Sequence, residues 1–159
     1  MRSRVSDDAD QPLAEVSVTL PATAENLATV YATLAQFWTQ LESRVSTPPD
    51  ATWRAYFDTA VGEIVSNIVR YAYSAASSDG EMSVVLQGFP DRVEATFRDR
   101  GVPYAGSPIG DARMPLDSAI DVLDLPEGGW GLAMTLAAVD DLQYTREADV
   151  NSWRFMKKL

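Results

Sequence analysis

Two pairs of β-rich segments, each joined by a short turn, limit the fold of this chain more than any other feature. The segments are residues 82–89 and 93–97, then 142–146 and 152–156. Pro90-Asp91-Arg92 separates the first pair, and the second pair turns around Asp149-Val150-Asn151. Strands joined by short turns pair antiparallel. We therefore expect an α/β (α+β) two-layer sandwich rather than a doubly wound parallel sheet.

The remaining regular segments are one further strand and the helices. Residues 14–20 alternate between apolar and polar side chains, as a half-buried strand does. Thr23 is placed to cap one helix, and Asp50 a second, longer helix that reaches about Tyr73. A third helix is expected after Gly131.

The pattern predicts one domain with a tail and a long loop. Residues 1–12 are polar and acidic and are predicted to be a disordered tail, which leaves 13–159 as a single domain. From residue 99 the pattern becomes rich in Gly, Pro and Asp. A stretch of this kind is usually a lid, a binding loop or a disordered segment, and we place a lid at about 104–127.

Composition excludes several classes of chemistry. The 159 residues include no cysteine and no histidine, which removes Cys and His nucleophiles, Ser-His-Asp triads and nearly all zinc sites. A net charge of −10 argues against nucleic acid as a partner, because its phosphate backbone binds to basic surfaces. The same charge allows a nucleotide whose phosphates are neutralised by Mg²⁺ and backbone N–H groups.

The sequence gives no indication of a membrane protein. No run approaches the roughly 20 apolar residues of a membrane-spanning helix, and no signal-peptide pattern opens the chain. We expect a soluble, cytoplasmic protein.

Three short motifs could carry chemistry, and the first lies in the second helix. Glu63 and Asn67 are four residues apart and share a polar side of that helix. A carboxylate there could deprotonate a hydroxyl, and an amide oxygen one turn later could bind Mg²⁺. Taken alone, Glu and Asn on a polar stripe of a helix are usually just solvated.

The second motif, Asp99-Arg100-Gly101, directly follows a strand. Its carboxylate could accept a hydrogen bond from an exocyclic amine such as that of adenine, and the glycine would allow a close backbone approach. The alternative is an ordinary Asp-x-Gly turn.

The third motif is Gly128-Gly129-Trp130-Gly131-Leu132, at the start of the third helix. Glycines before a helix expose N–H groups to an anion, although they also occur in plain flexible loops. The sequence contains neither a phosphate-binding P-loop, nor a complete Rossmann glycine pattern, nor the loop motifs of eukaryotic-type protein kinases.

The order of the three motifs resembles the GHKL ATPases, and within them the anti-sigma-factor serine kinases of the RsbW and SpoIIAB type. In this comparison Glu63 and Asn67 match the N box, Asp99 and Gly101 the G1 box, and residues 129–132 the G2 box. The likeness covers residues 14 to 158. It implies the GHKL (Bergerat-type) fold, a mixed, mostly antiparallel sheet with about three helices on one face.

The resemblance also implies roles for individual residues. Asn67 would hold Mg²⁺, Glu63 would be the catalytic base or polarising carboxylate, and Asp99 would contact the adenine amine of ATP. Gly101 would shape that pocket. The phosphates would be admitted by the G2 residues, which are Gly129, Gly131 and Leu132.

By the same resemblance, phosphate would pass to a serine of an anti-anti-sigma protein of the STAS fold. The resemblance also allows a sigma factor as a second partner, and a homodimer of this chain. The chain departs from the family at Tyr71, where His is common, and at Trp130, where Arg is frequent. These departures motivate the alternative of a nucleotide-binding module that sequesters its partner without phosphotransfer. A purely structural domain would leave the three motifs coincidental.

Overall fold

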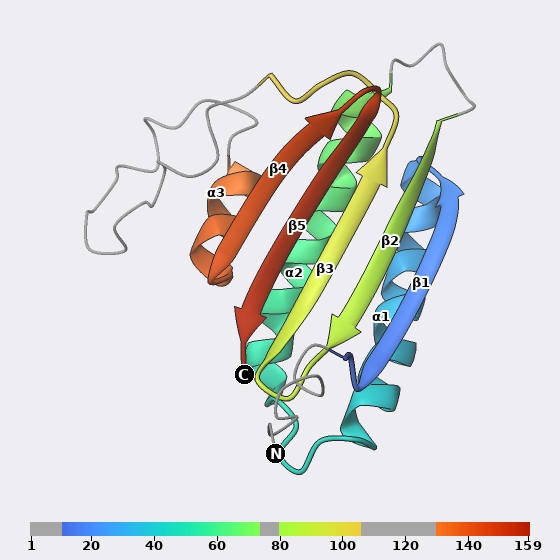
Figure 1. The fold of residues 1–159 in the computed structure, drawn as a ribbon. Coiled ribbons are helices and arrows are strands. Elements are labelled where there is room, and N and C mark those ends of the chain that lie inside the picture. The colour runs from blue at the N-terminus through green and yellow to red at the C-terminus, as the bar shows by residue number, and fades with distance from the viewer. Residues whose placement is uncertain (1–10, 74–79, 106–129) are drawn as a thin grey trace, which may run out of the picture.

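The computed structural model describes residues 11–73, 80–105 and 130–159. Residues 1–10 of the disordered tail expected at 1–12 and most of the lid expected at 104–127 lie outside these ranges, as does Gly129. Figure 1 shows one sheet with helices behind it.

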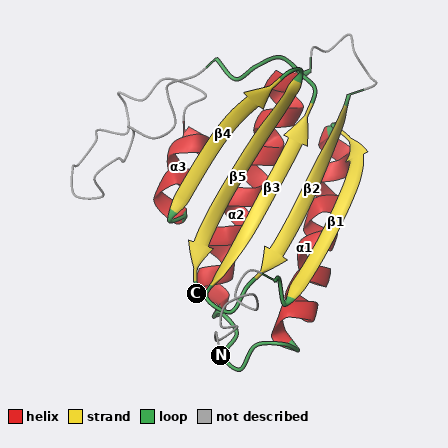
Figure 2. Cartoon of the chain, in the orientation of Figure 1, coloured by secondary structure: helices red, strands yellow, loops and turns green. Residues whose placement is uncertain are grey.

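The sheet has five strands in the order β1-β2-β3-β5-β4. Their bounds are β1 Ala14–Pro21, β2 Glu81–Gly88, β3 Arg92–Asp99, β4 Asp141–Glu147 and β5 Val150–Lys158. All four pairings between these strands are antiparallel. Both predicted hairpins are present, and the two-layer α+β fold expected from them is confirmed (Figure 2).

Three α-helices of the described chain lie on one face of the sheet (Figure 1). They are α1 Leu27–Glu42, α2 Ala51–Asn67 and α3 Trp130–Ala138. Asp50 caps α2 as predicted, because its side chain accepts a hydrogen bond from the Trp53 backbone N–H. Thr23 does not cap a helix in this way. It precedes the 3₁₀ turn Ala24–Asn26, and its hydroxyl accepts a bond from the Asn26 side chain instead.

The second helix changes form before its predicted end. After Asn67 the chain continues as a π-helical segment, Ile68–Ala72, and Tyr73 is already extended. Such segments are rare and occur often at functional sites. Here the segment brings the chain after Asn67 to the same end of the molecule at which β3 ends (Figure 1).

The core lies between the helices and the sheet and is rich in aromatic rings. The largest fully buried side chains include Phe37, Phe57, Phe97 and Phe155, which come from α1, α2, β3 and β5. Trp38 and Trp153 are also buried. This core fixes the ends of α2 and β3 relative to one another.

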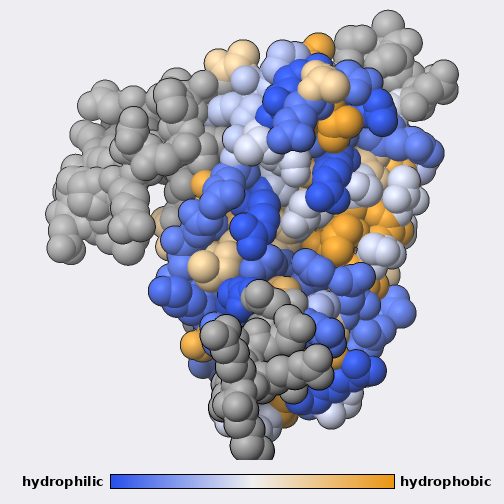
Figure 3. All heavy atoms as spheres, viewed as in Figure 1, coloured by the Kyte–Doolittle hydropathy of each residue, from blue (hydrophilic) through white to orange (hydrophobic). Residues whose placement is uncertain are grey.

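The other face of the sheet is largely hydrophilic (Figure 3). At its centre Glu94 is buried between Arg92 and Arg154, with carboxylate-to-guanidinium distances of 2.7 and 2.8 Å. No helix within the described ranges has the length and apolar character needed to cross a membrane.

Candidate functional site

Asp99, the last residue of β3, has a buried carboxylate. Only 3% of this residue is exposed, and its carboxylate points into the helix side of the sheet, as Phe97 does two residues earlier. One oxygen, Oδ1, accepts hydrogen bonds from the Gly101 backbone N–H at 2.9 Å and from the Asn151 amide at 2.8 Å. The other oxygen, Oδ2, is buried and has no hydrogen-bond partner among the described residues.

A buried, unpartnered carboxylate oxygen is costly, because it has lost water without gaining a donor. Native proteins keep few such atoms, and those they keep often belong to binding sites. Asp99 Oδ2 therefore fits a ligand that brings its own N–H donor, such as an exocyclic amine.

Asn151, on the neighbouring strand β5, lies directly opposite Asp99 in the sheet. It is 2% exposed, and its amide nitrogen donates to Asp99 Oδ1 and to the Val102 carbonyl at 3.0 Å. Its amide oxygen accepts from the Tyr144 hydroxyl at 2.7 Å and from the Arg146 guanidinium at 2.6 Å. Asn151 thus joins β3, β4 and β5 at the point where Asp99 sits.

Gly101 is closely packed against the π-helical segment. A Cβ on Gly101 would overlap the backbone carbonyl of Ala72. The next residue, Val102, donates its N–H to that same carbonyl at 2.7 Å. In the described structure the glycine is thus required by a backbone contact within the protein, in addition to any role toward a ligand.

Tyr73 and Arg100 form the rim of this corner. The Tyr73 hydroxyl accepts a bond from the Arg100 backbone N–H at 2.9 Å and donates to the Glu81 carbonyl at 2.7 Å. Burial, together with the nearby Asp99 and Glu81 carboxylates, raises the pKa of Tyr73 above its ordinary value. The Arg100 side chain pairs with Asp149 at 2.7 Å.

Asn67 lies on the side of α2 that faces away from α1. The α1 side of α2 is marked by Asp58, which accepts a hydrogen bond from Trp38 at 2.9 Å. Nine residues separate Asp58 from Asn67, which at about 100° per residue places them on opposite sides of the helix. The Asn67 side chain is half-buried, and among the described residues it has no hydrogen-bond partner.

Glu63 lies one turn before Asn67 and is also half-buried. In the described part of the chain its carboxylate makes no hydrogen bond or ion pair. It lies close enough to Tyr31 of α1 to contribute, after burial and Asp58, to the raised pKa of that phenol. α2 therefore carries a carboxylate and an amide one turn apart, and neither has a hydrogen-bond partner among the described residues.

Gly131 and Leu132 lie in the first turn of α3, which packs beside α2 and runs in the opposite direction (Figure 1). The start of α3 thus points toward the end of the molecule at which α2 and β3 end. Leu132 is partly buried against the core. At the far end of α3, the Lys157 ammonium donates to the Ala138 carbonyl at 2.8 Å.

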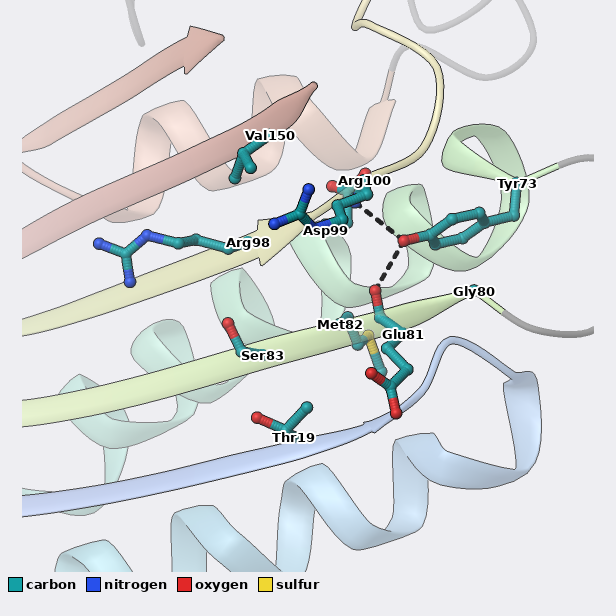
Figure 4. Close-up of a pocket in the computed structure, with 10 residues that line it drawn as sticks. All are labelled: Thr19, Tyr73, Gly80, Glu81, Met82, Ser83, Arg98, Asp99, Arg100 and Val150. Carbon is teal, nitrogen blue, oxygen red and sulfur yellow. Dashed lines mark hydrogen bonds between the residues drawn. The ribbon is translucent and has the colours of Figure 1, made fainter. Parts of the chain in front are cut away.

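A groove of about 400 Å³ borders the same end of the sheet (Figure 4). Its floor comes from Thr19, Ser83 and Arg98, which are neighbours on adjacent strands. Arg98 is exposed and Asp99 is buried, so their side chains lie on opposite faces of β3. The lining of the groove also includes Asp99, Tyr73 and Arg100, so the groove borders the corner that holds the Asp99 carboxylate.

The structure brings four of the predicted elements to one end of the fold: Asn67, Asp99, Gly101 and the start of α3 at Gly131. Sequence reasoning did not find Asn151, Tyr144 or Arg146, which complete the surroundings of Asp99. A buried asparagine opposite Asp99 could only have been recognised once the β3–β5 register was known. No group of three or more acidic side chains that could hold a metal occurs in the described ranges.

Comparison with known proteins identifies relatives of this chain. The family model of the histidine kinase-like ATPase domain matches residues 20–157. A serine-protein kinase RsbW of Bacillus mycoides is 29% identical over 129 residues, covering 81% of this chain and 76% of that protein. A serine-protein kinase RsbW of Bacillus cereus is also 29% identical, over 134 residues.

A crystal structure of the RsbU and RsbW domains of a Mycobacterium tuberculosis protein has the same fold. It superimposes with a TM-score of 0.59 at 22% sequence identity, and the match covers 90% of this chain but 31% of that longer one. The match of the family model over most of the chain, with the same fold, decides the family. The chain belongs to the histidine kinase-like ATPase domain family, the GHKL group, and within that group it is similar to the RsbW serine-protein kinases.

Proposed function

We propose that this protein binds Mg-ATP and phosphorylates a serine of a STAS-type anti-anti-sigma protein in a cytoplasmic partner-switching pathway. The observation that carries the proposal is Asp99, whose buried Oδ2 lacks a donor that the adenine amine of ATP would supply. The similarity to RsbW serine-protein kinases supports the reaction class.

The residues of the site fit the nucleotide as follows. Asp99 would accept a hydrogen bond from the base. Gly101, which packs on Ala72, would shape the pocket beside it. Gly131 and Leu132, in the first turn of α3, would face the phosphates, where backbone N–H groups and the helix dipole favour negative charge. Gly129, which lies outside the described residues, is the third predicted member of this phosphate site.

The metal would be held mainly by the nucleotide. Mg²⁺ binds oxygen ligands and commonly uses one or two protein side chains together with substrate phosphates and water. Asn67 is the candidate protein ligand, because its amide is half-buried and free of other described partners. When bound, the ion would neutralise phosphate charge during transfer.

Glu63 is the candidate base. Its carboxylate would take the proton from the serine hydroxyl of the partner as the serine oxygen forms its bond to the γ-phosphorus. The bond between that phosphorus and the bridging oxygen breaks, and ADP leaves. Glu63 makes no described hydrogen bond that would compete for this role.

Transfer of labelled γ-phosphate from ATP to a purified STAS-domain protein from the same genome tests the proposal. We expect stoichiometric label on one serine of that protein, and loss of transfer by 100-fold or more, on the order of a general-base contribution, in Glu63→Gln. Glu42→Gln, at the end of the neighbouring helix α1, is the matched control and should retain transfer. ATP binding without labelling of the partner would favour the sequestering module instead.

The second partner can be tested separately. A sigma factor bound by the same protein would be released when the unphosphorylated STAS protein is added, as partner switching requires. Sedimentation of the protein alone would show whether it is a homodimer.

A further inference from the structure

The orientation of the Asn151 amide is determined by its neighbours. The groups near its nitrogen are all acceptors, namely Asp99 Oδ1 and the Gly101 and Val102 carbonyls. The groups near its oxygen are both donors, the Tyr144 hydroxyl and the Arg146 guanidinium. An amide turned the other way would place its NH₂ group against the Arg146 guanidinium and its oxygen against three acceptors, so a single orientation is stable.

This fixed amide also fixes Asp99. With donors from Gly101 and Asn151 on Oδ1, the carboxylate cannot rotate without losing two hydrogen bonds in a buried place. Oδ2 is thereby held as the oxygen without a described partner.

Arg146 and Tyr144 extend the arrangement to β4, outside the three motifs. Arg146 donates from one guanidinium nitrogen to Asn151 and, at 3.0 Å, to the Gly101 carbonyl. The Tyr144 hydroxyl donates to Asn151 and accepts the Tyr104 backbone N–H at 2.9 Å. The positive charge of Arg146 thus lies at the acceptor end of an amide whose donor end contacts Asp99, an alignment that strengthens both bonds.

We infer that Asn151, held by Arg146 and Tyr144, is a positioning residue that keeps Asp99 Oδ2 directed at an amine donor and so sets the preference for an amino-purine nucleotide. The inference rests on the proposed binding of ATP at Asp99. None of the three residues needs to touch the nucleotide for this effect. They act through the orientation of one carboxylate.

Comparison of ATP with inosine triphosphate tests this directly, because inosine has a carbonyl oxygen where adenine has its amine. A carboxylate oxygen held toward that position attracts the amine and repels the carbonyl. We expect the wild type to bind ATP at least about tenfold more tightly than inosine triphosphate, which corresponds to one charge-assisted hydrogen bond.

Three variants should reduce this ratio. In Asn151→Leu it should fall below about threefold, because the Asp99 carboxylate then keeps only the Gly101 N–H as a donor and can turn its plane away from the base. Tyr144→Phe and Arg146→Gln should give intermediate ratios, and Tyr144→Phe retains the ring that packs against Trp153 and Tyr104. Tyr56→Phe, on an exposed part of α2, is the control and should leave the ratio unchanged.

Equal losses of affinity for the two nucleotides in all three variants would overturn the inference and leave Asn151 a structural residue. A wild type that binds neither nucleotide would instead remove the proposed function, and the inference with it.

A second readout needs no nucleotide. The Gly101 N–H donates to Asp99 Oδ1, so its amide resonance reports on the carboxylate. It should shift in Tyr144→Phe and Arg146→Gln but not in Tyr56→Phe. An unchanged Gly101 resonance in both variants would contradict the inference whether or not ATP binds.

Discussion

Gly101 packs directly on Ala72, and no room remains for a side chain between the chain that follows β3 and the backbone of the π-helical segment. The adjoining hydrogen bond from Val102 to the Ala72 carbonyl fastens the two segments together. The end of β3 and the chain that follows Asn67 therefore form one unit. In the proposed site, this contact fixes the base-binding carboxylate relative to the metal-binding helix.

Gly101→Ala should consequently destabilise the protein. The added methyl group meets a backbone carbonyl that cannot move without disturbing the Val102 bond, and overpacking of this kind costs about 1–3 kcal/mol. Urea unfolding at constant pH measures the change in free energy of unfolding.

Gly62→Ala is the matched control. Its methyl group would meet only the end of the Tyr31 side chain, which is 43% exposed and can move aside. Alanine is favoured over glycine inside a helix by roughly 0.5–1 kcal/mol, so this variant should be neutral or slightly stabilised. Equal destabilisation by both variants would contradict the assigned contact.

The two ion pairs of the buried Glu94 carboxylate, on the face of the sheet opposite the helices, predict a dependence of stability on pH. Burial alone would raise the pKa of Glu94, but hydrogen bonds from Arg92 and Arg154 and their charges outweigh burial, and the net shift is downward. A folded-state pKa below the unfolded value contributes stability above the unfolded pKa, and that stability is lost as pH falls through the folded value.

Glu94→Gln should therefore cost about 1–3 kcal/mol at pH 7, as expected for hydrogen bonds to charged groups. The difference from wild type should shrink once the pH falls below about 4, near the ordinary glutamate pKa. Unfolding curves from pH 7 to 3 measure it, with the exposed Glu15→Gln as control. A difference that stays constant over this range would show that charge is not involved.

The sequence was sufficient to predict the hairpins, the α2 cap and the two-layer class, because these depend on local turn residues and on the period of apolar side chains. The prediction was less accurate where distant contacts decide the structure. Thr23 bonds to a neighbouring side chain rather than to a helix N–H. The helix after Asn67 becomes π-helical where Ala72 packs on Gly101.

The start of the last strand was also predicted inexactly. The last hairpin turns at Ala148 and Asp149, so Val150 and Asn151 belong to β5 rather than to the turn. Ala148 has a φ of 54°, a conformation that alanine seldom adopts and that its sequence position does not indicate. That one shift places Asn151 opposite Asp99, which is why its contribution to the site could not be foreseen.

The hydrogen bond from Lys157 to the end of α3 predicts a local effect on the stability of that helix. Its ammonium binds the carbonyl of Ala138, the last residue of the helix, and its charge also opposes the negative end of the helix dipole. Lys157→Met should weaken the end of α3 by about 0.5–1 kcal/mol and speed amide hydrogen exchange there. Lys158→Met, one residue later on an exposed position, should not.

The central claim, that Asp99 reads the base of ATP, is tested most directly by calorimetric titration of ATP with Mg²⁺ into wild type, Asp99→Asn and Asp91→Asn. Asp91 precedes the same strand at its opposite end and is exposed, so it controls for the loss of one charge. We predict saturable binding to wild type and Asp91→Asn, and about 10- to 100-fold weaker binding to Asp99→Asn. Equal affinities for all three proteins, or no binding to the folded wild type, would contradict the account.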